Sequence, residues 1–130
     1  MKKFIILLST AMLCLSACQE SLEERAAKEA ATYTKKNCPQ VMSDMLDMDS
    51  MTFDKSSHTF GYHYTMKNGL DNEEAMRPEA MRQELLEGIK NMTSARAYMD
   101  EGYRFRYVYR SQKTPGKILF ETLFTEKDYK

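Results

Sequence analysis

The sequence predicts a single small α+β domain, in which an antiparallel sheet of about four strands carries helices on one of its faces. Three observations support this fold class: the chain has 130 residues, two segments alternate aromatic with other residues, and a helical segment precedes each of them. A chain of this length suits one domain and excludes an eight-unit βα barrel. Helices and strands that are apolar on one side bury those sides against each other in two layers.

The N-terminal segment has the layout of an export signal. Lys2 and Lys3 precede an apolar run from residue 4 to residue 15, and small residues follow. The run is too short for a helix that crosses a bilayer, which needs about 20 apolar residues. Residues 1–17 are therefore predicted to be a cleaved signal peptide.

The sequence Leu15-Ser16-Ala17-Cys18 resembles the lipobox of bacterial lipoproteins at all four positions. This resemblance implies that Cys18 carries a diacylglycerol thioether, that the chain is cut before it, and that the new amino terminus is acylated. Several acyl chains anchor a protein stably, whereas one does so only marginally. Gln19 stands where lipoproteins of the inner membrane usually have aspartate, so the outer membrane of the cell envelope is favoured. A simple secretory signal with a chance cysteine is the alternative.

Cleavage would change both the charge and the cysteine content. The signal holds two lysines and no acid, so Lys+Arg falls from 19 to 17 against 19 Asp+Glu, and the 130 − 17 = 113 mature residues carry −2. This charge gives no reason to expect a nucleic-acid partner. Cys14 leaves with the signal and Cys18 is lipidated, so Cys38 has no partner for an internal disulfide. The lipid on Cys18 is the only attached group we expect, with no other cofactor.

A first helix is expected after Ser21, because Glu24 follows three residues later in a capping-box pattern. It ends before Pro39, since proline disfavours helix in the preceding residue. Residues 18–37 are thus assigned to the lipidated N-terminus and first helix, and residues 38–130 to the α+β domain.

A hairpin follows in the first half of that domain. Residues 59–67 alternate between two faces, as in a half-buried strand. The polar residues 54–57 form a turn, which makes residues 48–53 the other arm. Residues 41–51 have no clear periodicity of their own.

The second half repeats this order. Residues 78–92 form the most regular amphipathic helix, with proline in its first turn. A short helical turn covers residues 93–99, and Gly102 stops it. Strands are expected at residues 103–110 and 118–125. A register that pairs Tyr107 with Phe120 and Arg106 with Glu121 places aromatic side chains inward and charged ones outward.

An aromatic pattern occurs twice, as Phe60-x-Tyr62-x-Tyr64 and as Phe105-x-Tyr107-x-Tyr109, with an offset of 105 − 60 = 45 positions. We expect these side chains to form the core beneath the helix of residues 78–92. If no helix covered part of them, they would form a stacking platform for sugar rings.

The end of the chain carries a second resemblance. Residues 102–109, followed by a turn, a strand and Asp128-Tyr129, resemble the C-terminal part of small bacterial envelope lipoproteins, and the likeness extends back to about Cys38. A terminal cysteine often follows the last aspartate in those proteins, and here Tyr129 stands instead. The resemblance implies an envelope lipoprotein and brings no activity with it.

Two groups of residues are candidate sites. Met42, Met45, Met48 and Met51 recur at intervals of three, and thioethers in such series bind Cu(I). Methionine also fills irregular cores, which is the preferred interpretation.

The second candidate is a face made of His63, Arg104, Arg106 and Arg110, which alternation places on the outer side of the sheet. Guanidinium groups match carboxylate or phosphate geometry, so an acidic partner or lipid headgroup would fit. Basic side chains also keep strands from pairing with other chains, which needs no ligand. His58 lies five residues from His63 and is expected on the opposite face, so the two should not bind a metal together unless His58 lies in the turn.

No catalytic motif is present: the sequence lacks a nucleophile elbow, a phosphate loop, a zinc-protease helix and a dinucleotide fingerprint. The sequence therefore predicts a non-enzymatic, lipid-anchored binding domain of the cell envelope. Its partners would be the membrane, through the lipid, and an envelope protein or glycan. Two alternatives stay open: a periplasmic Cu(I)-binding protein that uses the methionine series, and a small hydrolase with a base beside Cys38 or a serine.

Overall fold

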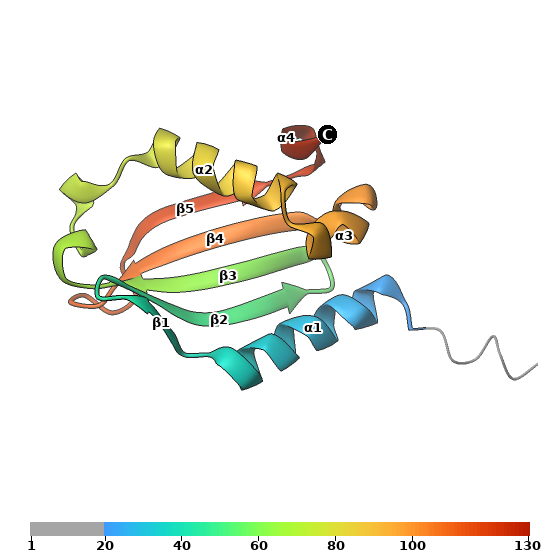
Figure 1. Ribbon diagram of the computed structural model, residues 1–130, viewed down its shortest axis with the longest axis horizontal. Coiled ribbons are helices and arrows are strands. Elements are labelled where there is room, and N and C mark those ends of the chain that lie inside the picture. The colour runs from blue at the N-terminus through green and yellow to red at the C-terminus, as the bar shows by residue number, and fades with distance from the viewer. Residues whose placement is uncertain (1–19) are drawn as a thin grey trace, which may run out of the picture.

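The computed structural model describes residues 20–130, so the predicted signal peptide and Cys18 lie outside the described part (Figure 1). The main elements are α1 (Leu22–Asn37), β1 (Gln40–Ser43), β2 (Leu46–Asp54), β3 (Thr59–Met66), α2 (Pro78–Lys90), α3 (Arg96–Asp100), β4 (Arg104–Ser111), β5 (Ile118–Phe124) and α4 (Glu126–Tyr129). Short 3-10 helices occur at Asn68–Leu70, Glu73–Ala75 and Thr93–Ala95. Within this part of the chain, none of the helices combines the length and the apolar character needed to cross a membrane.

The five strands form one sheet in the order β1-β2-β3-β4-β5. The α+β class and the single domain are confirmed, with one strand more than expected. That strand is β1, which lies in the segment without clear periodicity. The sheet is also mixed: β3 and β4 are parallel, while the other neighbours are antiparallel. The segment between β3 and β4 contains α2 and α3 and is long enough for the crossover that parallel neighbours need.

The aromatic repeat explains how the parallel pair is matched. Phe60 pairs with Phe105, Tyr62 with Tyr107, and Tyr64 with Tyr109, which is the same offset of 45 seen in the sequence. The rings stack across the two strands, with centroid separations of 5.7, 4.7 and 4.6 Å in that order. Aromatic side chains that lie side by side on neighbouring strands stabilise the sheet through ring–ring contact, in addition to the burial of each ring.

A β-bulge at Asp49 determines which face the methionines of β2 occupy. Residues three apart on a regular strand face opposite sides of the sheet. Here the register shifts between Met48 and Ser50, so that Met48 pairs with Tyr64 and Met51 pairs with Tyr62. The extra residue thus turns both methionines to the inner face.

The predicted register of the last hairpin was wrong by two residues. Tyr107 pairs with Thr122 and not with Phe120, which pairs with Tyr109. A shift of two leaves every side chain on its predicted face, because the side-chain period of a strand is two. Arg106 still forms an ion pair with Glu121, now diagonally.

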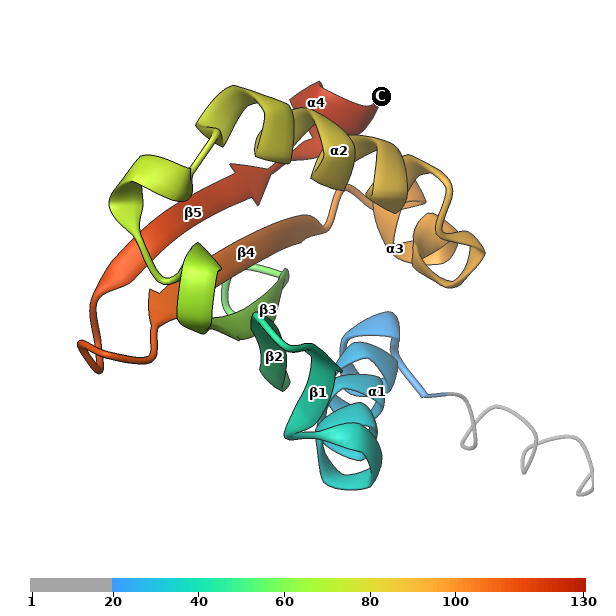
Figure 2. The same ribbon diagram turned by 60° about the vertical axis from the view of Figure 1, so that its left-hand side comes forward.

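The helices lie on one face of the sheet (Figures 1 and 2). Helix α1 runs along β2 and buries Ala26 and Ala30, and Ser21 caps it by accepting a 3.1 Å hydrogen bond from the Glu24 backbone N–H. It is therefore packed as part of the domain. Helix α2 lies over the half of the sheet that ends in β5, and it buries Ile89. The short helix α3 buries Tyr98.

The chain ends against the same layer. The hydroxyl of Tyr129 donates a 2.5 Å hydrogen bond to the backbone carbonyl of Tyr103. Arg82 of α2 pairs with Asp128 at 3.1 Å, and Asp128 accepts a hydrogen bond from the Thr125 N–H at the start of α4. Non-covalent contacts therefore hold α4 against the rest of the domain.

Candidate binding cleft

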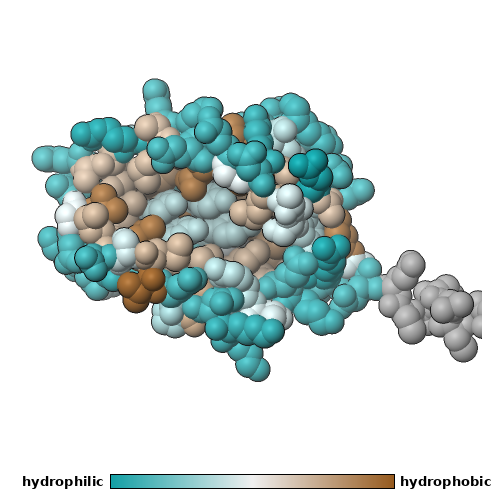
Figure 3. All heavy atoms as spheres, in the orientation of Figure 1, coloured by the Kyte–Doolittle hydropathy of each residue, from teal (hydrophilic) through white to brown (hydrophobic). Residues whose placement is uncertain are grey.

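A cleft opens on the inner face of the sheet, between α1 on one side and the segment from the end of α2 to α3 on the other. It measures about 340 Å³, which lies within the range of small-ligand pockets. Figure 3 shows the hollow with a pale floor and apolar residues along parts of its rim. Its lining is methionine and aromatic side chains for the most part, and the one charged residue among them is Glu29.

The floor consists of the stacked aromatic side chains of β3 and β4. Phe60 and Phe105 are almost fully buried, with 2% and 1% of their surface exposed, and Phe60 packs against Tyr98. Further along the strands Tyr62, Tyr64 and Tyr107 line the cleft. Their ring faces contact one another, so these rings do not form an open platform for sugars.

Four methionines contribute to the walls. Met48 and Met51 come from β2, Met42 from β1, and Met92 from the end of α2. Met42 is 51% exposed and lies at the entrance. The fourth member of the sequence series, Met45, does not line the cleft. The regular spacing therefore does not correspond to one four-residue cluster, and Met92 was not part of the prediction.

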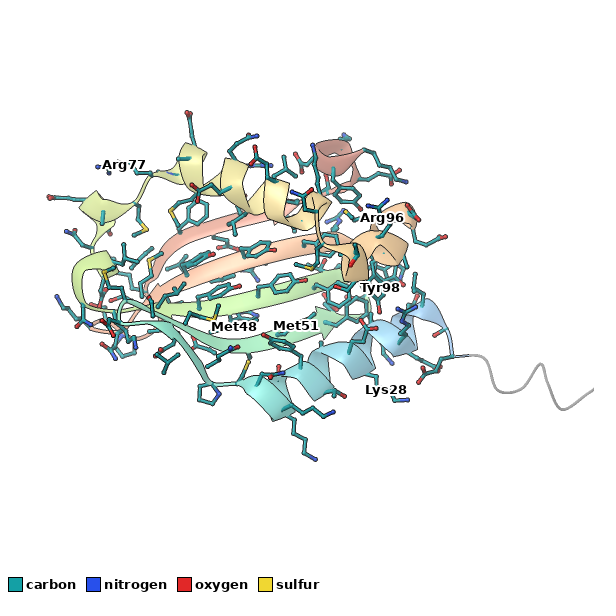
Figure 4. All side chains as sticks on the ribbon, viewed as in Figure 1. Lys28, Met48, Met51, Arg77, Arg96 and Tyr98 are labelled. Atoms are coloured by element: carbon teal, nitrogen blue, oxygen red, sulfur yellow. The ribbon has the colours of Figure 1, made fainter. Side chains whose placement is uncertain are left out.

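Glu29 and Tyr98 join the two sides of the cleft. The Tyr98 hydroxyl donates a 2.8 Å hydrogen bond to Glu29 Oε2, while Arg25 Nε lies 3.0 Å from Glu29 Oε1. The Arg25 guanidinium also lies 5.7 Å from the centroid of the Tyr98 ring. Burial and the neighbouring Glu29 carboxylate raise the pKa of Tyr98. Figure 4 shows Tyr98 on the part of α3 that is nearer to α1, and it shows Met48 and Met51 on β2. Sequence reasoning missed this link, because 69 positions separate the two residues.

The basic candidate face lies on the opposite side of the sheet. His63 Nδ1 is 3.1 Å from Arg110 Nη1, and His63 Nε2 is 3.0 Å from Thr52 Oγ1. Arginine has no acceptor, so Nδ1 must accept, and the neutral ring donates through Nε2. Burial, followed by the charges of Arg110 and Arg106, lowers the pKa of His63.

The structure thus brings His63, Arg106 and Arg110 together on this outer face. Arg104 is exposed and pairs in register with Thr59 at the other end of the strand. Arg106 forms an ion pair with Glu121, and Arg110 donates a hydrogen bond to His63. No feature of these contacts identifies a ligand.

The remaining histidine and cysteine lie apart from each other. His58 occupies the β2–β3 turn with φ +52°, lies 2.6 Å from Glu23 of α1, and stacks on Tyr103. Cys38 ends α1, and burial raises the pKa of its thiol. Within residues 20–130 no hydrogen bond joins Cys38 to either histidine, and no cluster of three His, Cys, Asp or Glu side chains is placed to hold a metal.

Solved structures of low sequence identity share this fold. A predicted secreted protein from Pseudomonas aeruginosa has a TM-score of 0.67 at 17% identity, over 86% of this chain and 100% of that one. The type II secretion system pilotin AspS from Vibrio cholerae has a TM-score of 0.60 at 19% identity, over 82% and 90%. The type 2 secretion pilotin EpsS from Vibrio vulnificus has a TM-score of 0.65 at 14% identity, over 83% and 91%. At these identities the likeness establishes the fold alone.

No curated protein sequence matches the chain. Residues 21–120 match the family described as domain of unknown function DUF8479, from the cap of α1 into β5. Because this match covers most of the chain, the protein belongs to the DUF8479 family.

Proposed function

We propose that this protein is a non-enzymatic lipoprotein of the cell envelope, whose cleft docks a helix of another envelope protein. The observation that carries the proposal is the cleft itself, which is open, lined by methionine and aromatic side chains, and placed between two helical walls. The shared fold with two type II secretion pilotins supports a role in envelope assembly. Methionine suits such a surface because its flexible thioether adapts to different partners.

The backbone of the cleft favours a helix over an extended segment. Strands β3 and β4 supply the floor and β2 supplies two of the wall methionines, and each of these strands is paired on both sides. They have no free strand edge to offer, so the occupant must satisfy its own backbone hydrogen bonds, as a helix does. A helix laid between two helical walls presents one face to the floor and its flanks to the methionines.

The lipobox supplies the anchoring part of the proposal. Helix α1 begins at Leu22, four positions after Cys18. An extended chain spans at most about 3.6 Å per residue, so a lipid on Cys18 would hold the start of the domain within roughly 14 Å of the membrane surface. The cleft would then lie close to the bilayer, most simply that of the outer membrane.

Fractionation of cells that express Cys18→Ala tests the anchor. The wild-type protein is expected in the membrane fraction, and the variant in the soluble periplasmic fraction. Cys38→Ala is the matched control, because it removes a thiol outside the lipobox and should leave the protein in the membrane. If Cys18→Ala stays in the membrane in the wild-type amount, the anchoring claim fails.

Site-specific photo-crosslinking in cells tests the docking. A photoreactive phenylalanine derivative that replaces Met51 lies in the cleft. The same group in place of Leu123, which is 39% exposed, lies on the outer face of the sheet. We expect a discrete adduct with one envelope protein from position 51 and none from position 123. The opposite result would move the partner to the outer face. If the protein is retained on cell-wall glycan and forms no adduct with a protein, the partner is a glycan and the proposed protein partner is wrong.

Cu(I) binding is a second candidate function, because Met42, Met48, Met51 and Met92 line one cavity. Soft thioether ligands select this ion. Titration of Cu(I) against a competing chelator tests it, with Met48→Leu and Met51→Leu expected to abolish binding and Met45→Leu, outside the cleft, expected to preserve it. Absence of stoichiometric binding would remove the candidate.

A further inference from the structure

The hydroxyls of the tyrosines on the cleft floor have no partner within the domain. Three tyrosines use their hydroxyls within residues 20–130: Tyr98 bonds to Glu29, Tyr33 to Gln40, and Tyr129 to the Tyr103 carbonyl, while Tyr103 and Tyr109 have no such bond. Similarly, no hydrogen bond joins the hydroxyls of Tyr62, Tyr64 and Tyr107 to any of residues 20–130. The rings are paired with one another, but their polar ends are left to whatever fills the cleft.

These hydroxyls are neutral, Tyr62 and Tyr107 are buried, and Tyr64 is half-buried. Tyr62 and Tyr107 expose 7% and 5% of their surface. Burial raises the pKa of Tyr64 to about 12 and raises the pKa values of Tyr62 and Tyr107 still further. Each hydroxyl therefore keeps both its donor and its acceptor capacity at neutral pH. Water satisfies such groups in an open cleft, whereas a purely aliphatic occupant would displace the water and leave them unsatisfied.

We infer that Tyr62, Tyr64 and Tyr107 select the occupant of the cleft, which is a helix with uncharged hydrogen-bonding side chains, such as Ser, Thr, Asn or Gln, along the strip that faces the floor. This inference rests on the proposed docking function and specifies the sequence of the partner. The flanks of the helix are apolar, because methionines form the neighbouring walls.

Charged side chains are disfavoured along that strip. Glu29 is the one charged residue of the lining, and it is already engaged by Tyr98 and Arg25. A carboxylate on the occupant would face Glu29, and a cation would lose its water without gaining a free partner. Uncharged polar groups avoid both losses and still reach the phenols.

Two labelled synthetic helices serve as the probe. Both have 16 residues, the length of the α1 wall, and equal net charge. They differ at three positions of one helical strip, which are Leu in one peptide and Ser or Gln in the other. Binding to the full chain in lipid nanodiscs is measured by fluorescence anisotropy, with empty nanodiscs as the baseline. The ratio of the two dissociation constants is the readout, because the general hydrophobicity of leucine cancels when that ratio is compared between variants.

We expect the triple substitution Tyr62→Phe, Tyr64→Phe and Tyr107→Phe to shift this ratio at least about tenfold toward the leucine peptide. Tyr109→Phe is the matched control, because Tyr109 stacks on Tyr64 and is 7% exposed but does not line the cleft. It should leave the ratio unchanged.

An equal ratio in the wild type and the triple variant, with both peptides bound, overturns the selective role of the phenols and leaves the docking function standing. If neither peptide binds above the empty nanodiscs, the docking function fails, and this inference fails with it. Thermal unfolding of each variant shows whether it is folded at the assay temperature.

Discussion

Replacement of Tyr98 by Phe removes one defined contact between the two sides of the cleft. The Tyr98 ring is 2% exposed, packs edge-on against Phe60 at 4.8 Å, and lies beneath the Arg25 guanidinium. Phenylalanine keeps all of these ring contacts. What is lost is the 2.8 Å hydrogen bond from the Tyr98 hydroxyl to Glu29.

The expected loss of stability follows from the surroundings of that bond. A hydrogen bond to a charged group contributes about 1.5–3 kcal/mol. The Glu29 side chain is 42% exposed, so water replaces part of the lost interaction in the variant. We therefore expect a decrease of about 1 kcal/mol in the free energy of unfolding. For the roughly 110 residues of the folded part, an unfolding entropy of about 0.23 kcal/mol/K converts this to a decrease in Tm of about 4 °C.

Thermal unfolding followed by circular dichroism measures the change in the wild type, Tyr98→Phe, Glu29→Gln and the double variant. The cycle isolates the Tyr98–Glu29 coupling from the separate ion pair between Glu29 and Arg25. Tyr33→Phe is the control, because its hydroxyl makes a longer, exposed bond of 3.3 Å to Gln40, and its Tm should change by less. A Tm of Tyr98→Phe within 1 °C of the wild type, or a coupling near zero, would refute the reasoning.

Two further predictions use the backbone and the outer face. Gly88→Ala should stabilise the protein by about 0.5–1 kcal/mol, because Gly88 lies inside α2 with open space around it. Gly102→Ala should destabilise it by about 1–2 kcal/mol, because Gly102 has φ +76° and an added Cβ would approach Glu126. Urea unfolding measures both variants, and changes in the free energy of unfolding that have the same sign would contradict this account. The folded state lowers the pKa of His63, so the unfolded chain binds this proton first, and wild-type stability should fall as the pH drops below about 6.5. His63→Gln should lose less between pH 7.5 and pH 5 in urea titrations, and an identical pH dependence would show that His63 does not contribute.

Local patterns were sufficient to predict most elements. Alternation located β3 and β4, a capping residue located α1, and apolar spacing located α2, because each of these signals lies within one element. Strand β1 gave no signal: its four residues are all exposed, so none of the apolar alternation of a half-buried strand is present. The register of the β4–β5 hairpin was wrong by two because a shift of two leaves the inward and outward pattern unchanged.

The site was less predictable, because it depends on contacts between distant segments. The aromatic side chains of β3 and β4 were correctly placed on one face, yet their pattern does not reveal that α1 and α2 leave a gap above them. Glu29 lies in α1, Tyr98 in α3 and Met92 in the connection after α2, and no local spacing connects them. The turn of Met48 and Met51 to one face also required the bulge at Asp49, which the sequence does not signal.

The parallel pairing of β3 and β4 connects the sequence repeat with the shape of the cleft. In this pairing Phe60 lies beside Phe105, both are buried, and Phe60 packs against Tyr98 of α3, while Tyr62 and Tyr107 continue the floor toward Tyr64. An antiparallel pairing of the same two segments would place phenylalanine beside tyrosine at both ends and would mix the two kinds of side chain. The parallel register instead collects the floor residues without hydroxyls at the end near Tyr98 and those with hydroxyls along the rest of the floor. An occupant therefore meets phenylalanine and then tyrosine side chains in a fixed order, which gives the floor a direction as well as a composition.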